Sequence, residues 1–135
     1  MIKKYLLDTN AYSAYLSGDK NVLSALAESD QVLISVIVLG ELYAGFAGGS
    51  HEKKNREILG NFLKKSRTTV LQVSHAAAEI FGALKSGLKA AGTPIPINDV
   101  WISAQAVENG AKLITFDGHF KNVPGLLIWD ADPTA

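Results

Sequence analysis

The chain has 135 residues, of which 47% are hydrophobic and 19% charged, a balance that excludes a disordered chain and favours a single globular domain. It carries 13 basic and 13 acidic residues, so its formal net charge of zero gives no strong overall attraction for nucleic acid. The absence of cysteine excludes disulfides, thiolate nucleophiles and cysteine-ligated zinc.

Short apolar runs predict strands at residues 2–7, 31–35, 69–73, 112–116 and 126–129. Apolar residues at helical spacing predict helices at residues 11–16, 19–27, 36–47, 50–65, 74–91 and 98–110. Ser50, Ser74 and Asn98 are expected to cap the helices that they precede, and Gly110 to end the last helix. The segment 93–97 holds two prolines and predicts an extended linker.

Strands that alternate with helices predict an α/β fold, with a central, mainly parallel sheet flanked by helices on both faces. We expect one domain over residues 1–135, with a core at about 2–129 and a loose tail at 130–135. The sequence has no signal-peptide pattern and no apolar segment long enough to span a membrane. A soluble, cytoplasmic protein without membrane contact is therefore the simplest expectation.

Four acidic residues stand nearly alone among apolar neighbours: Asp8, Glu41, Asp99 and Asp117. Asp8 and Asp117 each follow an apolar run, so they would emerge side by side if the first and fourth strands are neighbours in the sheet. Each acid also has an ordinary explanation, such as a helix cap for Asp8 or a first-turn position for Asp99. Four such coincidences in one short chain favour a shared site.

Carboxylates that converge repel one another, and their pKa values rise unless a cation is present. Mg²⁺ and Mn²⁺ prefer oxygen ligands of this kind. Ions held in this way can activate water and neutralise a phosphodiester in its transition state. The acids therefore predict metal-dependent phosphodiester chemistry.

The motifs Asp8-Thr9-Asn10, Glu41, Asn98-Asp99 and Thr115-Phe116-Asp117-Gly118-His119-Phe120 resemble the PIN-domain family of metal-dependent ribonucleases. The chain length and the run Pro94-Ile95-Pro96-Ile97-Asn98-Asp99-Val100-Trp101-Ile102 are similar to the VapC-type toxins of bacterial and archaeal toxin–antitoxin pairs. The resemblance covers residues 2–129. It implies a PIN-like fold and an endoribonuclease that is the toxin component of a type II toxin–antitoxin system.

The resemblance also implies a role for individual residues. The acidic quartet Asp8, Glu41, Asp99 and Asp117 would bind Mg²⁺ or Mn²⁺ and hold the water that attacks the RNA. Polar residues that match supporting positions in the family are Thr9, Asn10, Asn98 and Thr115. The implied partners are an RNA substrate, a cognate antitoxin protein and a second copy of the chain in a homodimer.

Other residues invite functional readings with less support. Six basic residues are expected to cluster on one helix, as either an RNA-binding surface or a solvated face: Lys53, Lys54, Arg56, Lys64, Lys65 and Arg67. His119 lies close enough to Asp117 to touch substrate, but packing on Phe116 or Phe120 is the favoured prediction. Trp101 and Trp129 lie in apolar patterns and predict core positions.

Two other functions stay open from the sequence. A HAD-like aspartyl phosphotransferase with Asp8 as nucleophile would need a second acid where Asn10 stands and a lysine partner near Asp117. A non-catalytic, nucleotide-binding α/β module would need a glycine-rich loop after the first strand, and the sequence has none there.

Overall fold

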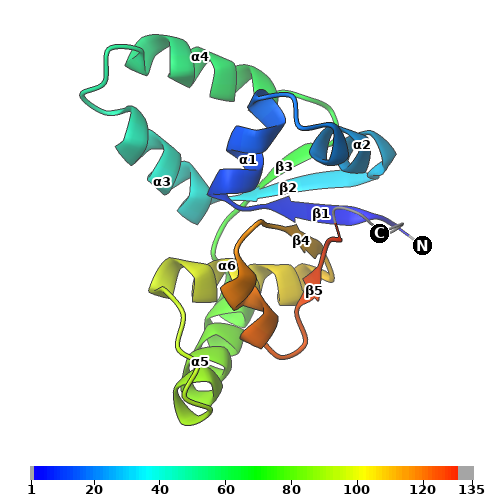
Figure 1. Cartoon of the computed structure of the whole chain (residues 1–135), viewed down its shortest axis with the longest axis vertical. Helices are drawn as coiled ribbons and strands as arrows, with labels where there is room; N and C mark the ends of the chain where they lie inside the picture. The colour runs from blue at the N-terminus through cyan, green and yellow to red at the C-terminus, as the bar shows by residue number, and fades with distance from the viewer. Residues whose placement is uncertain (1, 131–135) are drawn as a thin grey trace.

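A computed structural model describes residues 2–130 of the chain (Figure 1). Within this range the strands are β1 (Lys4–Leu7), β2 (Gln31–Ser35), β3 (Thr68–Leu71), β4 (Lys112–Ile114) and β5 (Leu127–Ile128). The α-helices are α1 (Thr9–Leu16), α2 (Lys20–Glu28), α3 (Val36–Phe46), α4 (Glu52–Leu63), α5 (His75–Ala90) and α6 (Ile97–Asn109). A short 3-10 helix, η1 (Gly118–Asn122), lies between β4 and β5.

The strands form one parallel sheet in the order β3-β2-β1-β4-β5. β1 is central and pairs with β2 on one side and with β4 on the other. Its register sets Leu7 beside Ile34 of β2 and Ile114 of β4, so β1 and β4 end level with each other and β2 ends one residue later. Side chains that follow β1, β2 and β4 therefore gather at one edge of the sheet, where open α/β sheets bind ligands.

Helices cover both faces of the sheet, as predicted: α1 to α4 lie on one side, and α5 and α6 on the other (Figure 1). The main core is built on the strands, and Leu6, Leu7, Ile34, Leu113 and Ile114 are completely buried in it. Full burial of an aliphatic side chain stabilises a fold by about 1.5–3 kcal/mol. A smaller core joins α5 to α6 through residues that include Leu84, Leu88, Val100 and Ala104.

Short polar side chains start most of the helices. The predicted cap at Ser74 is confirmed, because its hydroxyl accepts from the Ala77 N–H at 3.0 Å. Asp8 begins α1 and Ser35 begins α3 in the same way. The prediction for Gly110 also holds: it ends α6 in the left-handed region, at a φ of 62° that suits glycine.

Two predicted caps are wrong. The first turn of α4 is closed by a bond from the Asn55 N–H to the His51 carbonyl, so Ser50 stands one residue too early to cap it. The carbonyl of Pro96 accepts from the N–H groups of Asp99 and Val100, so α6 starts upstream of Asn98. Asn98 therefore lies inside the first helical turn rather than before it.

Predicted boundaries differ from the observed ones by one to two residues at most elements, and one difference affects the site. The strand predicted at 112–116 ends at Ile114, and the backbone then turns, with the Asp117 N–H donating to the Thr115 hydroxyl at 3.0 Å. The loose tail predicted at 130–135 lies outside the described residues, apart from Asp130. Within residues 2–130, no helix combines the length and the apolarity needed to cross a bilayer.

Candidate active site

A cleft of about 380 Å³ opens at the edge where β1, β2 and β4 end. The residues that line it are Asp8, Thr9, Asn10, Glu41, Pro96, Ile97, Asn98, Asp99, Ile102 and Asp117. We call this the acidic cleft. It brings together all four acids singled out from the sequence, although they come from different parts of the chain.

Asp8 is the most enclosed of the four acids, at 4% exposed. It follows β1 directly, and one of its carboxylate oxygens accepts from the Ala11 N–H at 2.8 Å, which caps α1. Burial raises the pKa of Asp8 above its ordinary value, hydrogen bonds from Thr115 and Ala11 lower it, and the charges of Asp117 and Asp99 raise it. The cap and the acidic site are thus two roles of one side chain.

Asp99 stands in the first turn of α6, where the helix dipole favours an acid. Its Oδ2 atom forms a hydrogen bond of 2.8 Å with Nε2 of His119. Burial raises the pKa of Asp99, contact with His119 lowers it, and the negative charges of Glu41 and Asp117 raise it. Because the charges of Glu41 and Asp117 both act on Asp99, each of these two acids lies within electrostatic reach of Asp99.

Glu41 projects from the middle of α3 and is half-buried, as its apolar neighbours in the sequence indicated. Its Oε1 atom accepts from the Thr9 hydroxyl at 2.8 Å, which ties α3 to the start of α1. A carboxylate held by a single hydroxyl keeps lone pairs free for a cation or for water. Glu41 thus lines the cleft with carboxylate lone pairs available to a ligand.

Asp117 is exposed and begins η1. Oxygens of Asp99 and Asp117 and a ring nitrogen of His119 lie within 4.8 Å of one another, a separation that one ion can bridge. Asp8 and Glu41 add two more carboxylates to the same cleft. This donor set suits a hard divalent cation, because carboxylate oxygens dominate it and the acids repel one another without such an ion.

A family model for the PIN domain matches residues 5–126. The chain belongs to the PIN-domain family. Ribonuclease VapC2 of Rickettsia felis is 32% identical to it over 133 residues, and the match covers 93% of this chain and 98% of that protein. This similarity assigns the chain to the VapC ribonucleases within the family.

Solved structures give the same assignment. The structure of VapBC2 from Rickettsia felis, bound to a DNA fragment from its promoter, matches with a TM-score of 0.82 and 30% identity over 94% of this chain and 99% of that one. The DNA-bound VapBC from Salmonella typhimurium matches with a TM-score of 0.85 and 27% identity over 97% of this chain and 99% of that one. The parallel sheet with helices on both faces is therefore the PIN-like fold that the sequence predicted.

The supporting residues predicted for this PIN domain fall into two groups. Thr9, Asn10 and Asn98 line the acidic cleft with the acids. Thr115 is 8% exposed and does not line it, but its hydroxyl bonds to Asp8 and accepts from the Asp117 N–H. Thr115 therefore connects two of the four acids, since it fixes the side chain of one and the backbone of the other.

The six basic residues do not form one helical face. α4 ends at Leu63, so Lys64, Lys65 and Arg67 lie beyond it. Among the described residues, no lysine or arginine lines the acidic cleft. The structure thus separates the predicted RNA-binding residues from the acids, and their contact with RNA stays a prediction.

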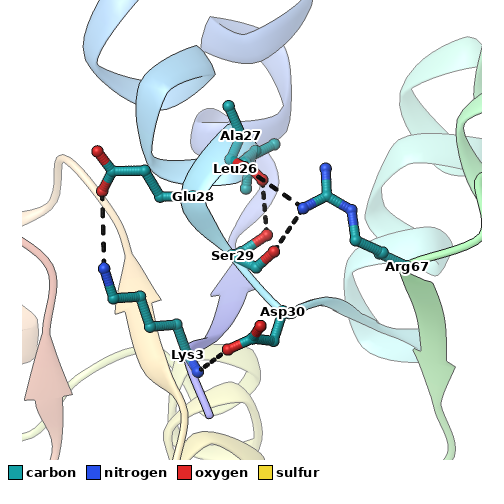
Figure 2. A network of polar contacts seen from close by, with 7 residues as sticks. All are labelled: Lys3, Leu26, Ala27, Glu28, Ser29, Asp30 and Arg67. Atoms are coloured by element: carbon teal, nitrogen blue, oxygen red, sulfur yellow. Dashed lines mark hydrogen bonds and ion pairs between the residues drawn. The ribbon is translucent and has the colours of Figure 1, made fainter. Parts of the chain in front are cut away.

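Two of these basic residues have structural partners. Arg56 pairs with Glu52 at 3.6 Å and lies over the ring of Tyr43 at 4.6 Å. Figure 2 shows the guanidinium of Arg67 donating to the carbonyls of Ala27 and Ser29 at the end of α2. These contacts connect α4 to α3 and the start of β3 to α2.

His119 is the residue whose role the sequence understated. Its ring packs against Phe120 at 4.7 Å, as predicted, but its Nε2 atom also bonds to Asp99. The signal available in the sequence was only the short interval between His119 and Asp117. The contact with Asp99 joins residues 20 positions apart and depends on how η1 is placed against α6.

Proposed function

We propose that this PIN domain is a Mg²⁺- or Mn²⁺-dependent endoribonuclease, and that it is the toxin of a type II toxin–antitoxin pair. The observation that carries the proposal is the convergence of four carboxylates in one cleft of a chain that belongs to the VapC ribonucleases. The raised pKa values of Asp8 and Asp99 support it, because a cation would relieve the cost of keeping both acids charged.

In this proposal, Asp8, Asp99 and Asp117 hold the divalent ion, and Glu41 completes the acidic quartet. The ion, when bound, would acidify a water molecule and neutralise charge on the phosphodiester. Thr9 orients Glu41 through its hydroxyl, and Thr115 restrains Asp8 and the backbone of Asp117. His119 positions Asp99 by its hydrogen bond, while Asn10 and Asn98 offer amide groups to the substrate at the mouth of the cleft.

The proposed partners are an RNA substrate and a cognate antitoxin. Support for the antitoxin comes from similar solved structures, which are described as VapBC assemblies from Rickettsia felis, Salmonella typhimurium and nontypeable Haemophilus influenzae. A homodimer stays a prediction from family resemblance. A cytoplasmic location is part of the proposal because cellular RNA is the proposed substrate.

The test is cleavage of purified cellular RNA with Mg²⁺ or Mn²⁺. We expect cleavage that stops in excess chelator and falls at least a hundredfold in Asp99→Asn, because that variant loses a charge at the proposed ion. Asp19→Asn is the matched control, since Asp19 caps α2 outside the acidic cleft. Full activity in chelator, or wild-type cleavage by Asp99→Asn, would contradict the proposal.

A further inference from the structure

A second cleft, of about 450 Å³, adjoins the acidic cleft and shares Asp117 with it. Its walls come from the segment after β4, from η1 and from the end of β5, and they include Thr115, Phe116, Lys121, Ile128 and Trp129. Because β5 runs parallel to β4, this cleft opens at the same edge of the sheet as the acidic cleft. A ligand that binds at Asp117 could therefore extend from the acidic cleft into the second cleft.

Two aromatic rings form the apolar part of this second cleft. Phe116 is 51% exposed, and its ring lies 6.2 Å from that of Trp129 at an interplanar angle of 89°. The backbone N–H of Trp129 donates a hydrogen bond of 2.9 Å to the carbonyl of Leu113, and the residue is only half-buried. The core position predicted for Trp129 is therefore only partly correct, since it also lines a cleft.

Although Phe116 contacts Trp129 edge to face, about half of its surface is exposed beside the acidic cleft and offers a flat apolar surface to a ligand. Such rings bind nucleobases by stacking, which every base can do because each has a π-face, and differences in stacking strength give a modest base preference. The polar groups of the second cleft fit this ligand too. Exposed Lys121 lines the second cleft and offers a positive charge for a phosphate beside the base.

We propose that the second cleft is a nucleobase subsite: Phe116 and Trp129 receive the unstacked base of a nucleotide next to the scissile phosphate. This inference rests on the proposed function. An RNA strand whose scissile phosphate lies at Asp117 must place its next nucleotide against a surface that adjoins this residue. The second cleft is such a surface, because Asp117 lines both clefts. Lys121, at the wall of the same cleft, can then contact the phosphate that follows this nucleotide in the RNA.

The first experiment maps the ends produced from a pool of single-stranded RNA randomised in its central segment. We expect the wild-type protein to show a base preference at a position beside the cut, and Phe116→Ala to lose that preference. Leu127→Ala is the matched control, because Leu127 is 52% exposed on β5 but does not line the second cleft. Phe116→Tyr keeps an aromatic ring and should keep the base preference. It is the second variant to measure if Phe116→Ala folds poorly.

The second experiment uses one cleaved member of that pool, made with and without the base at the preferred position. Removing the base should lower kcat/KM of the wild type by about 5- to 150-fold, the range that corresponds to stacking of one base on an aromatic side chain. In Phe116→Ala the same removal should cost less than about twofold, because the ring that distinguished the two RNAs is absent.

Several outcomes would overturn the subsite. One is an unchanged base preference in Phe116→Ala, and another is an equal penalty for base removal in both proteins. Loss of antitoxin binding by Phe116→Ala, with unchanged RNA preference, would make the surface a protein contact instead. A wild-type protein that does not cut RNA at all would contradict both the proposed function and the subsite. If Asp99→Asn is inactive but Phe116→Ala keeps the base preference, the result contradicts the subsite alone.

Discussion

Asp8 combines a structural contact with an unfavourable environment for its charge. Its carboxylate caps α1 through the Ala11 N–H, yet it is almost fully buried and faces the charges of Asp117 and Asp99. An asparagine at this position would keep the capping oxygen, since asparagine and aspartate are about equally good N-caps. The charge of Asp8 is therefore useful for binding a cation and costly without one.

We expect Asp8→Asn to stabilise the metal-free protein at neutral pH by on the order of 1 kcal/mol, because it removes a buried charge that the cation would otherwise offset. The same variant should lose RNA cleavage. Chemical denaturation in chelator measures the first effect, with Asp19→Asn expected to change stability by only a few tenths of a kcal/mol. Destabilisation of metal-free Asp8→Asn would show that the charge itself holds the fold together.

This stabilisation should depend on pH in a defined direction. Because burial raises the pKa of Asp8 in the folded state, the folded protein binds more protons than the unfolded chain between the ordinary Asp value and the raised one. The contribution of Asp8 to the free energy of unfolding is then complete below the ordinary value and is lost as pH rises through the raised pKa. The advantage of Asp8→Asn over wild type, measured in chelator, should grow with pH across that window; an advantage that shrinks would contradict the burial argument.

The acidic cleft depends on where β1, β4, α3 and α6 begin and end. The adjacency of β1 and β4 places Asp8 beside the turn to Asp117, and the start of α6 at Ile97 places Asp99 in the first turn. The sequence predicted this convergence because its signals are local: an apolar run that ends at an acid, or a single acid in an apolar helix.

Other contacts could not be predicted because they depend on tertiary packing. His119 reaches Asp99 because Phe120 is completely buried and anchors η1 against the core. Ser50 seemed a good cap, but the first helical bond starts at His51, and residue type alone does not decide between adjacent positions. The sequence offered Arg67 either for RNA or for a solvated helix face, and it could not indicate the bonds of Arg67 to carbonyls at the end of α2, about 40 positions earlier in the chain.

Arg67 gives a prediction for the contact between α2 and β3. Arg67→Ala should lower the free energy of unfolding by about 1 kcal/mol, because it removes charged hydrogen bonds to carbonyls at the carboxyl end of a helix. RNA cleavage should stay unchanged in conditions where the variant is folded. Lys65→Ala, an exposed neighbour, should change stability by less than about 0.5 kcal/mol. A loss of cleavage at unchanged stability would instead assign Arg67 to RNA binding.

At the scale of the whole molecule, the fold is a rigid support for acids that repel one another. A divalent ion that binds only the folded state should stabilise the protein, by about 2.7 kcal/mol at a concentration a hundredfold above its Kd. We expect Mn²⁺ to raise the Tm of the wild type, and to raise that of Asp99→Asn much less. Asp19→Asn should respond like the wild type, and an equal response of Asp99→Asn would place the ion outside the acidic cleft.

Proton competition adds a second signature to this binding. Protons and the ion compete for Asp8 and Asp99, whose pKa values are raised by burial, so the affinity for Mn²⁺ should fall as pH falls toward those values. Calorimetric titration at several pH values measures this dependence. An affinity that rises on acidification would mean that groups other than these carboxylates hold the ion.

The most direct measurement is a crystal structure of the wild-type protein with Mn²⁺, with the ion located by its anomalous scattering. We expect a peak inside the acidic cleft, at bonding distance from carboxylate oxygens of Asp99 and Asp117 and beside Asp8. A protein that cleaves RNA with Mn²⁺ but shows no ion in that cleft, or holds it on another surface, would contradict the proposed metal site.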